Sequence, residues 1–183
     1  MPQRELVEQA QRGDPEAFEA LLSGARDRLY GIAWRILRDP YRAEDALQQA
    51  LIQIWKDLPG LHDPERFDAW TYRLVVHTSY REAQRERCWT SRIRQLQVDP
   101  PGDDRVGTVI DRDEVERGFR RLTPEHRAVL VLHYYVGLPV PEIADTLGVP
   151  IGTARSRLHY AVRSLRAACE ADDRVVVAWR TMT

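Results

Sequence analysis

The segment Leu138–Arg166 is the feature that most restricts how this chain can fold. Its first half places apolar residues on one face of a short helix and ends at Gly148, which accepts the positive φ of a tight turn without steric cost. A second helix is predicted from about Ile151, because apolar residues then recur at steps of 4, 3, 4 and 3: Ala154, Leu158, Ala161, Leu165 and Ala168. This layout is typical of a helix-turn-helix, whose second helix enters the DNA major groove.

The second predicted helix is basic, although the whole chain has a formal net charge of −1. From Ile151 to Ala168 there are four arginines and no acidic residue. Many helical hairpins have a glycine corner, and an arginine-rich face is often only a solvated face, so the pattern by itself leaves both interpretations open. The absence of carboxylates from this helix favours a focused contact with nucleic acid.

Three Asp-Pro pairs predict helix starts in the first half of the chain, at Asp14, Asp39 and Asp63. In each pair the aspartate caps the helix and the proline takes its first position. With the apolar period of 3.6, they predict four helices, at Arg4–Arg12, Pro15–Arg38, Pro40–Leu58 and Phe67–Arg94. These helices can share one apolar core, which is enough for an independent domain over residues 1–95.

The rest of the chain divides into a linker, a second domain and a tail. Residues 96–112 contain prolines and glycines without a helical period and are interpreted as a flexible linker. Helices resume and carry the helix-turn-helix in a domain over residues 113–169. The tail, residues 170–183, is polar and then briefly β-prone, and no role is assigned to it. The expected fold class is all-α, with two small helical domains.

Sequence motifs for catalysis, cofactors and metals are missing. There is no GxxxxGK[ST], GxGxxG, GxSxG or HExxH, and the five histidines are scattered. No metal site, no cofactor and no enzymatic activity are therefore expected. Cys88 and Cys169 are far apart and fit reduced thiols in the cytoplasm. No secretion signal is visible, and the longest apolar run, Val175–Trp179, is too short to span a bilayer.

Two separated segments resemble the extracytoplasmic-function sigma factors of bacterial RNA polymerase. DPYRAEDALQQALIQIWKDL (Asp39–Leu58), followed by FDAWTYRLVVHTSYREAQRER (Phe67–Arg87), is similar to region 2 of that family. LTPEHRAVLVLHYYVGLPVPEIADTLGVPIGTARSRLHYAVRSLR (Leu122–Arg166) is similar to region 4. The resemblance implies a factor that binds core polymerase, directs it to a promoter and helps to melt the DNA.

The resemblance also implies which residues bind. The helix Asp39–Leu58 is expected to dock on the coiled coil of the β′ clamp, and region 4 on the β flap. The residues matched to the clamp-binding face are Glu44, Asp45, Gln48 and Gln49. The helix Phe67–Arg87 and the loop before it are expected to bind the minus-ten element through Arg66, Arg73, His77, Tyr80, Arg81 and Arg85. Phe67 and Trp70 are expected in the core instead, while Tyr72 fits either place.

The second helix of the helix-turn-helix is expected to read the minus-thirty-five element. The candidates for base edges are Arg155, Ser156, His159 and Tyr160, and those for phosphates are Thr153, Arg157 and Arg163. The chain departs from the family pattern at His77, where asparagine is usual, at Tyr160, where a basic residue is frequent, and at Pro139, where a serine or threonine commonly caps the helix.

Two other interpretations remain at this level. One is a two-domain DNA-binding regulator that does not dock on polymerase. The other is a sigma-like decoy that only sequesters an anti-sigma factor. The family resemblance itself implies an anti-sigma partner, which nothing in the sequence identifies. The promoter sequence and the inducing signal are likewise not encoded in any recognisable motif.

Overall fold

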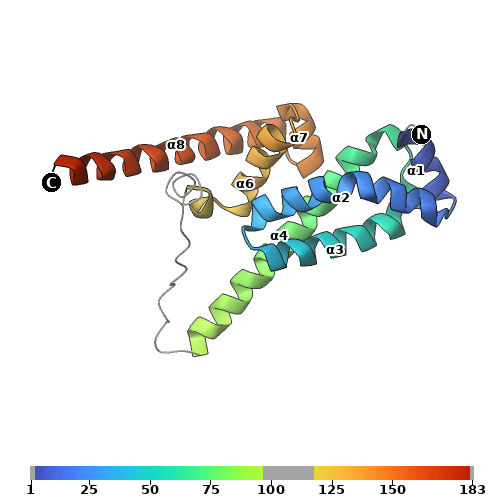
Figure 1. Cartoon of the computed structure of the whole chain (residues 1–183), viewed down its shortest axis with the longest axis horizontal. Coiled ribbons are helices and arrows are strands. Elements are labelled where there is room, and N and C mark those ends of the chain that lie inside the picture. Colours follow the sequence, from blue (N-terminus) through green and yellow to red (C-terminus); the bar gives the residue numbers. More distant parts are fainter. Residues whose placement is uncertain (1–2, 97–117, 182–183) are drawn as a thin grey trace.

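The computed structural model describes residues 3–96 and 118–181, with side chains described for residues 3–90 and 118–167. Every regular element in these ranges is a helix, which confirms the all-α prediction. The first half contains α1 (Gln3–Gln11), α2 (Pro15–Leu37), α3 (Pro40–Asp57), the short turns η1 (Leu58–Gly60) and η2 (Pro64–Arg66), and α4 (Phe67–Leu96). The second half contains α6 (Pro124–Leu130), η3 (Val131–Tyr135), α7 (Val140–Leu147) and α8 (Ile151–Thr181) (Figure 1).

The three predicted Asp-Pro starts are confirmed. The Asp14 carboxylate accepts hydrogen bonds from the backbone N–H groups of Glu16 and Ala17, at 3.0 and 3.3 Å. Asp39 caps α3 in the same way, and Asp63 caps η2. Each cap satisfies N–H groups that would otherwise lack a partner at the helix start. The caps therefore fix where α2, α3 and η2 begin, and η2 leads directly into α4.

The first helical unit is built around α2, α3 and α4, which pack against one another, with α1 lying across one end (Figure 1). Its core consists of apolar side chains at most 1% exposed, among them Leu29, Ile32, Ile36, Leu47, Ile54, Leu58, Phe67 and Val75. Each such side chain contributes roughly 1.5–3 kcal/mol to stability when it leaves water. Phe67 is thus a core residue, as predicted. Tyr72 is also buried, and its hydroxyl accepts a hydrogen bond from Arg28 at 2.8 Å.

The helix-turn-helix forms as predicted. Gly148 ends α7 with φ +64°, and the N–H of Val149 then donates to the carbonyl of Ala144 at 3.0 Å. Pro139 stands at the cap of α7 and makes no side-chain capping bond there. Ala154 and Ala161 lie buried on the inner face of α8. The two helices therefore pack through the apolar stripe that the sequence shows.

The tail, to which the sequence assigned no role, is helical, including its β-prone residues 175–177. Helix α8 continues to Thr181 and extends away from the rest of the molecule (Figure 1). The valines at 175–177 disfavour a helix by only tenths of a kcal/mol each, and alanine, glutamate and arginine before them favour it. No glycine or proline lies in this stretch to end the helix. A boundary at residue 169 is therefore not visible in the backbone.

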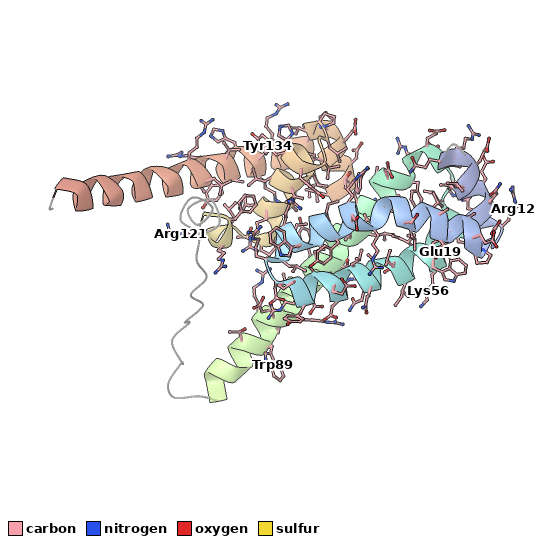
Figure 2. All side chains as sticks on the ribbon, viewed as in Figure 1. Arg12, Glu19, Lys56, Trp89, Arg121 and Tyr134 are labelled. Atoms are coloured by element: carbon pink, nitrogen blue, oxygen red, sulfur yellow. The ribbon has the colours of Figure 1, made fainter. Side chains whose placement is uncertain are left out.

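The two helical units touch along a seam that the sequence did not predict, where side chains lie between the two sets of helices (Figure 2). Arg127 of α6 donates to the carbonyl of Ile36 at the end of α2, at 2.6 Å. The Arg35 guanidinium lies 3.8 Å from the centre of the Tyr135 ring, and that of Arg38 lies 5.6 Å from the Phe119 ring. Arginine side chains therefore make much of this contact, which joins α2 and α4 to α6, η3 and α7.

Candidate nucleic-acid and polymerase interface

The first turns of α8 present the predicted reading face to solvent. Arg155, Ser156, His159, Tyr160 and Arg163 are all exposed, while Thr153 and Arg157 are half-buried. The Ser156 hydroxyl donates to the carbonyl of Thr153 at 3.0 Å. Residues 151–167 of α8 include no acidic residue, so this part of the helix does not repel phosphate, and the helix N-terminus favours anions. The acidic residues of α8, Glu170, Asp172 and Asp173, come further along the helix. The predicted reading face is accessible in this structure without rearrangement.

The predicted minus-ten face of α4 is the second candidate surface. Arg73, His77, Arg81 and Arg85 are exposed and follow one another at steps of four, so they form a single stripe. Burial lowers the pKa of His77 below its ordinary value, and Arg73 and Arg81 lower it further. The His77 ring is therefore neutral at pH 7 and can both donate and accept a hydrogen bond. Arg66 lies just before α4 and pairs with Asp63 at 3.8 Å.

Tyr80 lies apart from that stripe, in the seam between the two units. Its hydroxyl is buried and, among the described residues, has no hydrogen-bond partner. Burial raises the pKa of Tyr80 well above its ordinary value, and the Glu125 carboxylate adds to the rise while Arg157 opposes it. Glu125 in turn lies 3.8 Å from Arg87. A minus-ten candidate and a minus-thirty-five candidate, Tyr80 and Arg157, thus lie close enough to affect each other.

Arg73 also reaches the second unit. Its guanidinium lies 3.7 Å from the position that a Cβ atom would take on Gly148, at the corner of the helix-turn-helix. The contact places part of the α4 stripe against the turn that precedes the reading helix. The two predicted DNA-binding surfaces are therefore neighbours in this structure.

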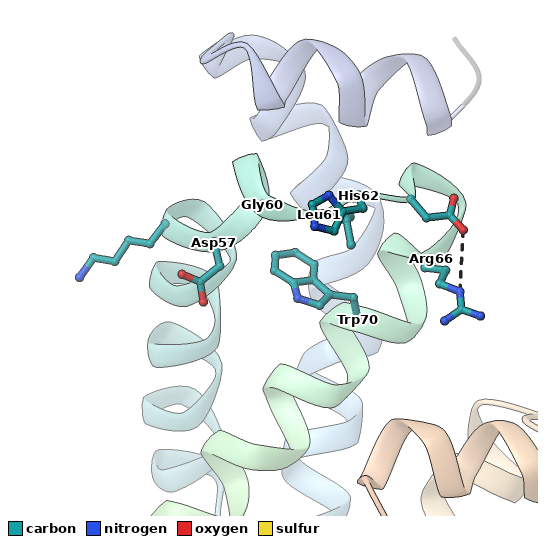
Figure 3. Close-up of a pocket in the computed structure, with 8 residues that line it drawn as sticks. Asp57, Gly60, Leu61, His62, Arg66 and Trp70 are labelled. Carbon is teal, nitrogen blue, oxygen red and sulfur yellow. Dashed lines mark ion pairs between the residues drawn. The ribbon is translucent and has the colours of Figure 1, made fainter.

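An open cavity of about 870 Å³ lies where α3 ends and α4 begins (Figure 3). Its lining residues come from both helices and from the loop between them: Lys56, Asp57, Gly60, Leu61, His62, Asp63, Arg66 and Trp70. Trp70 was expected in the core but is only half-buried, and its indole forms a wall of this cavity. The spacing of three residues between Phe67 and Trp70 suggested that Trp70 is buried as well. It could not reveal that the indole lines an open cavity together with the loop between α3 and α4.

The outer face of α3 carries the four predicted polar residues. Asp45 and Gln48 are exposed, whereas Glu44 and Gln49 are half-buried, and Glu44 lies 3.4 Å from Arg26. The same face also carries three large apolar residues that were not predicted as binding residues: Tyr41, Ile52 and Trp55 are 84%, 56% and 47% exposed. Together with Asp45 and Gln48 they form one series along the helix, at positions 41, 45, 48, 52 and 55, with steps of 4, 3, 4 and 3. That spacing, opposite the buried stripe, was the available signal.

Other site types are not seen in the part of the chain that the structure describes. No group of three histidine, cysteine or acidic side chains could hold a metal ion. No helix within the same ranges is long and apolar enough to cross a membrane. A further cavity of about 550 Å³ lies beside the seam, between Arg35, Tyr134, Tyr135 and Leu165.

Comparison with known families decides the identity. Residues 21–88 match the family model "Sigma-70 region 2", and residues 118–167 match "Sigma-70, region 4". The chain is 32% identical over 169 residues to the ECF RNA polymerase sigma factor SigK of Mycolicibacterium vanbaalenii, covering 88% of this chain and 86% of the relative. The chain belongs to the extracytoplasmic-function (ECF) sigma factors.

Solved structures agree on the fold. The chain superimposes on CnrH, solved in complex with the cytosolic domain of CnrY, with a TM-score of 0.68 at 24% identity, covering 93% of this chain and 98% of that one. It superimposes on the sigma factor RpoE of Bartonella quintana, solved with the anti-sigma factor NepR, with a TM-score of 0.66 at 19% identity, covering 85% and 98%. The family models and the identity to SigK confirm the resemblance to the ECF family, and the function of this chain is promoter-directed initiation of transcription.

Proposed function

We propose that region 4 of this sigma factor reads the minus-thirty-five element with the exposed face of α8. The observation that carries this assignment is that residues 151–167 of α8 present arginines, a histidine and a tyrosine to solvent and include no carboxylate. Arg155 is placed to make a bidentate contact to guanine, supported by Ser156, His159 and Tyr160 at base edges. Thr153, Arg157 and Arg163 hold phosphates and fix the register.

The stripe on α4 binds the minus-ten element. Arg73, Arg81 and Arg85 are suited to the backbone of the melted strand, and neutral His77 to a base edge. The cavity beside α4 has a Trp70 wall for stacking and Arg66 at its rim, which suits an unpaired base. This cavity adds Trp70 and His62 to the residues proposed from the sequence.

Core polymerase docks on the outer face of α3. Glu44, Asp45, Gln48 and Gln49 supply polar contacts to the β′ clamp, and the exposed Ile52 and Trp55 supply the apolar area that stable interfaces need. Trp55 is held in place by the edge of Phe18, at 4.6 Å between ring centres. Region 4 contacts the β flap.

The protein acts in the cytoplasm, without a cofactor and without an enzymatic activity of its own. A likeness to RpoE, which was solved with the anti-sigma factor NepR, supports an anti-sigma factor as a further partner.

Promoter binding separates the two units. Arg73 lies against the Gly148 corner, and Tyr80 lies within electrostatic reach of Arg157. The two promoter elements lie roughly two turns of DNA apart, on the order of 70 Å. Surfaces that touch cannot both reach their elements, so the seam opens when polymerase and DNA bind.

The test is run-off transcription with the purified full chain, core polymerase and a library of promoters. A specific transcript whose promoter carries two conserved elements supports the proposal. Binding of the chain to core polymerase without any specific transcript contradicts promoter recognition and favours the decoy interpretation. Specific DNA binding without binding to polymerase favours the DNA-binding regulator instead.

A further inference from the structure

One contact joins the reading helix to the start of α6. The ring of His126 lies 4.6 Å from the ring of Tyr160, with 37° between their planes. Tyr160 is 56% exposed, so one side of its ring rests on the imidazole and much of the rest faces solvent. His126 is itself held, because its Nδ1 lies 2.8 Å from the Thr123 hydroxyl.

Thr123 is the N-cap of α6, which makes this support rigid. The Thr123 hydroxyl oxygen accepts the backbone N–H of His126 at 3.4 Å. Burial and the nearby Arg157 lower the pKa of His126 below its ordinary value, despite the opposing effect of Glu125. The imidazole is therefore neutral at pH 7, and Nδ1 can accept the hydroxyl proton of Thr123. A helix cap, an imidazole and the Tyr160 phenol thus form one connected series.

The series matters because an exposed tyrosine on a helix otherwise samples several rotamers. Ordering such a side chain when an interface forms costs conformational entropy. Stacking on a ring that is already fixed orders the tyrosine before DNA arrives. An aromatic pair of this kind is also favourable beyond the area that it buries.

We propose that His126 is a positioning residue for Tyr160, holding its ring on the DNA-reading side of α8 for contact with the minus-thirty-five element. This inference rests on the proposed function. His126 touches no base in it and acts only through the tyrosine. The family resemblance points to the reading helix, whereas this assignment adds a residue from the helix that packs behind it.

A double-mutant cycle tests the inference. The full chain is assembled with core polymerase, and its affinity is measured for a duplex carrying the promoter recovered by run-off selection. Tyr160→Ala and His126→Ala are each expected to weaken binding about 2- to 10-fold, which is the range of one aromatic pair. The double variant is expected to bind no more weakly than Tyr160→Ala. His126→Phe, which keeps a ring under Tyr160, is expected to recover most of the loss.

Tyr134→Ala is the matched control. Tyr134 is an exposed tyrosine of the same unit that contacts a histidine, His133 at 4.7 Å, rather than a residue of α8. Its removal is expected to leave the affinity unchanged. Circular-dichroism melting of each variant shows whether a loss comes from unfolding.

Three outcomes overturn the inference. Losses that add in the double variant mean that His126 acts on its own. A His126→Phe variant as weak as His126→Ala, with equal melting temperatures, means that the ring does not act through stacking. Wild-type affinity for His126→Ala removes the role altogether. If instead the wild-type chain directs no specific transcript in the run-off assay, the proposed function itself fails. If the wild-type chain does direct one and any of the three outcomes above is found, only the positioning role of His126 fails.

Discussion

The two helices proposed to bind DNA, α4 and α8, carry similar residues in different surroundings. The predicted reading face of α8 is open to solvent, and residues 151–167 include no carboxylate. The face of α4 has Glu82 paired with Arg85 at 3.3 Å, and it meets the second unit at Arg73 and Tyr80. The proposed DNA-binding surface of α8 is therefore accessible in the free protein. That of α4 becomes fully accessible only after the seam opens.

Arg155→Ala gives the largest expected effect, because the exposed face of α8 needs no rearrangement. Loss of a bidentate arginine–guanine contact costs about 1–3 kcal/mol, so run-off transcription from the cognate promoter falls by roughly 5- to 150-fold. The melting temperature stays unchanged, since Arg155 is exposed. Arg166→Ala is the control: Arg166 is an exposed arginine three turns further along α8, and transcription is expected to persist. Equal losses for both variants would contradict the assignment.

Gly31→Leu tests the seam from the side of α2. A Cβ atom at Gly31 would overlap the Tyr135 hydroxyl, so a leucine side chain is expected to displace the Tyr135 ring from α2 and to weaken the contact between the two units. The expected result is a larger radius of gyration in small-angle X-ray scattering. Gly24→Leu is the matched control, because open space surrounds Gly24 on the same helix. Both variants remove a helical glycine, and only the first is expected to expand the protein.

Tyr80→Phe is expected to close the seam more firmly. A buried hydroxyl without a partner destabilises the closed arrangement by about 1–3 kcal/mol, and phenylalanine removes it. The raised pKa of Tyr80 gives a pH signature. In the open form the hydroxyl ionises from about pH 10, and in the closed form only at higher pH, so the wild-type seam weakens as pH rises above about 10. Scattering across that pH range is expected to show weaker opening of the phenylalanine variant than of the wild type.

Glu125→Gln gives the smallest expected effect on the seam. The Glu125 and Arg87 side chains are partly exposed and 3.8 Å apart, a distance at which solvent screens most of the attraction. Ion pairs of this kind contribute about 0–1 kcal/mol. The radius of gyration is therefore expected to change less than for Gly31→Leu. A larger change would mean that charge, rather than packing at Gly31, holds the seam.

Much of the fold was predictable because its signals are local. The Asp14 and Asp39 caps, the Gly148 corner and the apolar stripe of α8 each lie within a few residues of the structure they determine. The exposure of Arg155 and Ser156 follows from the same helical period. These features need no knowledge of distant contacts.

The rest depends on contacts between distant parts of the chain, which periodicity does not encode. The bond from Arg127 to Ile36 spans 91 positions, and no pattern in the sequence predicts it. For the same reason the burial of Tyr80 was missed, and so was the half-exposed wall formed by Trp70. The stacking of His126 on Tyr160 likewise depends on how α6 packs against α8. Tertiary packing decided each of these cases.

The most direct test of the account is the distance between the two units before and after promoter binding. Spin labels at Cys88 and at Glu142→Cys, in a chain with Cys169→Ser, report that distance by pulsed electron resonance. Opening of the seam predicts a single distance in the free protein, set by the closed units, and a distance longer by tens of ångströms in a promoter complex that is competent for transcription. An unchanged distance in that complex would contradict the opening of the seam.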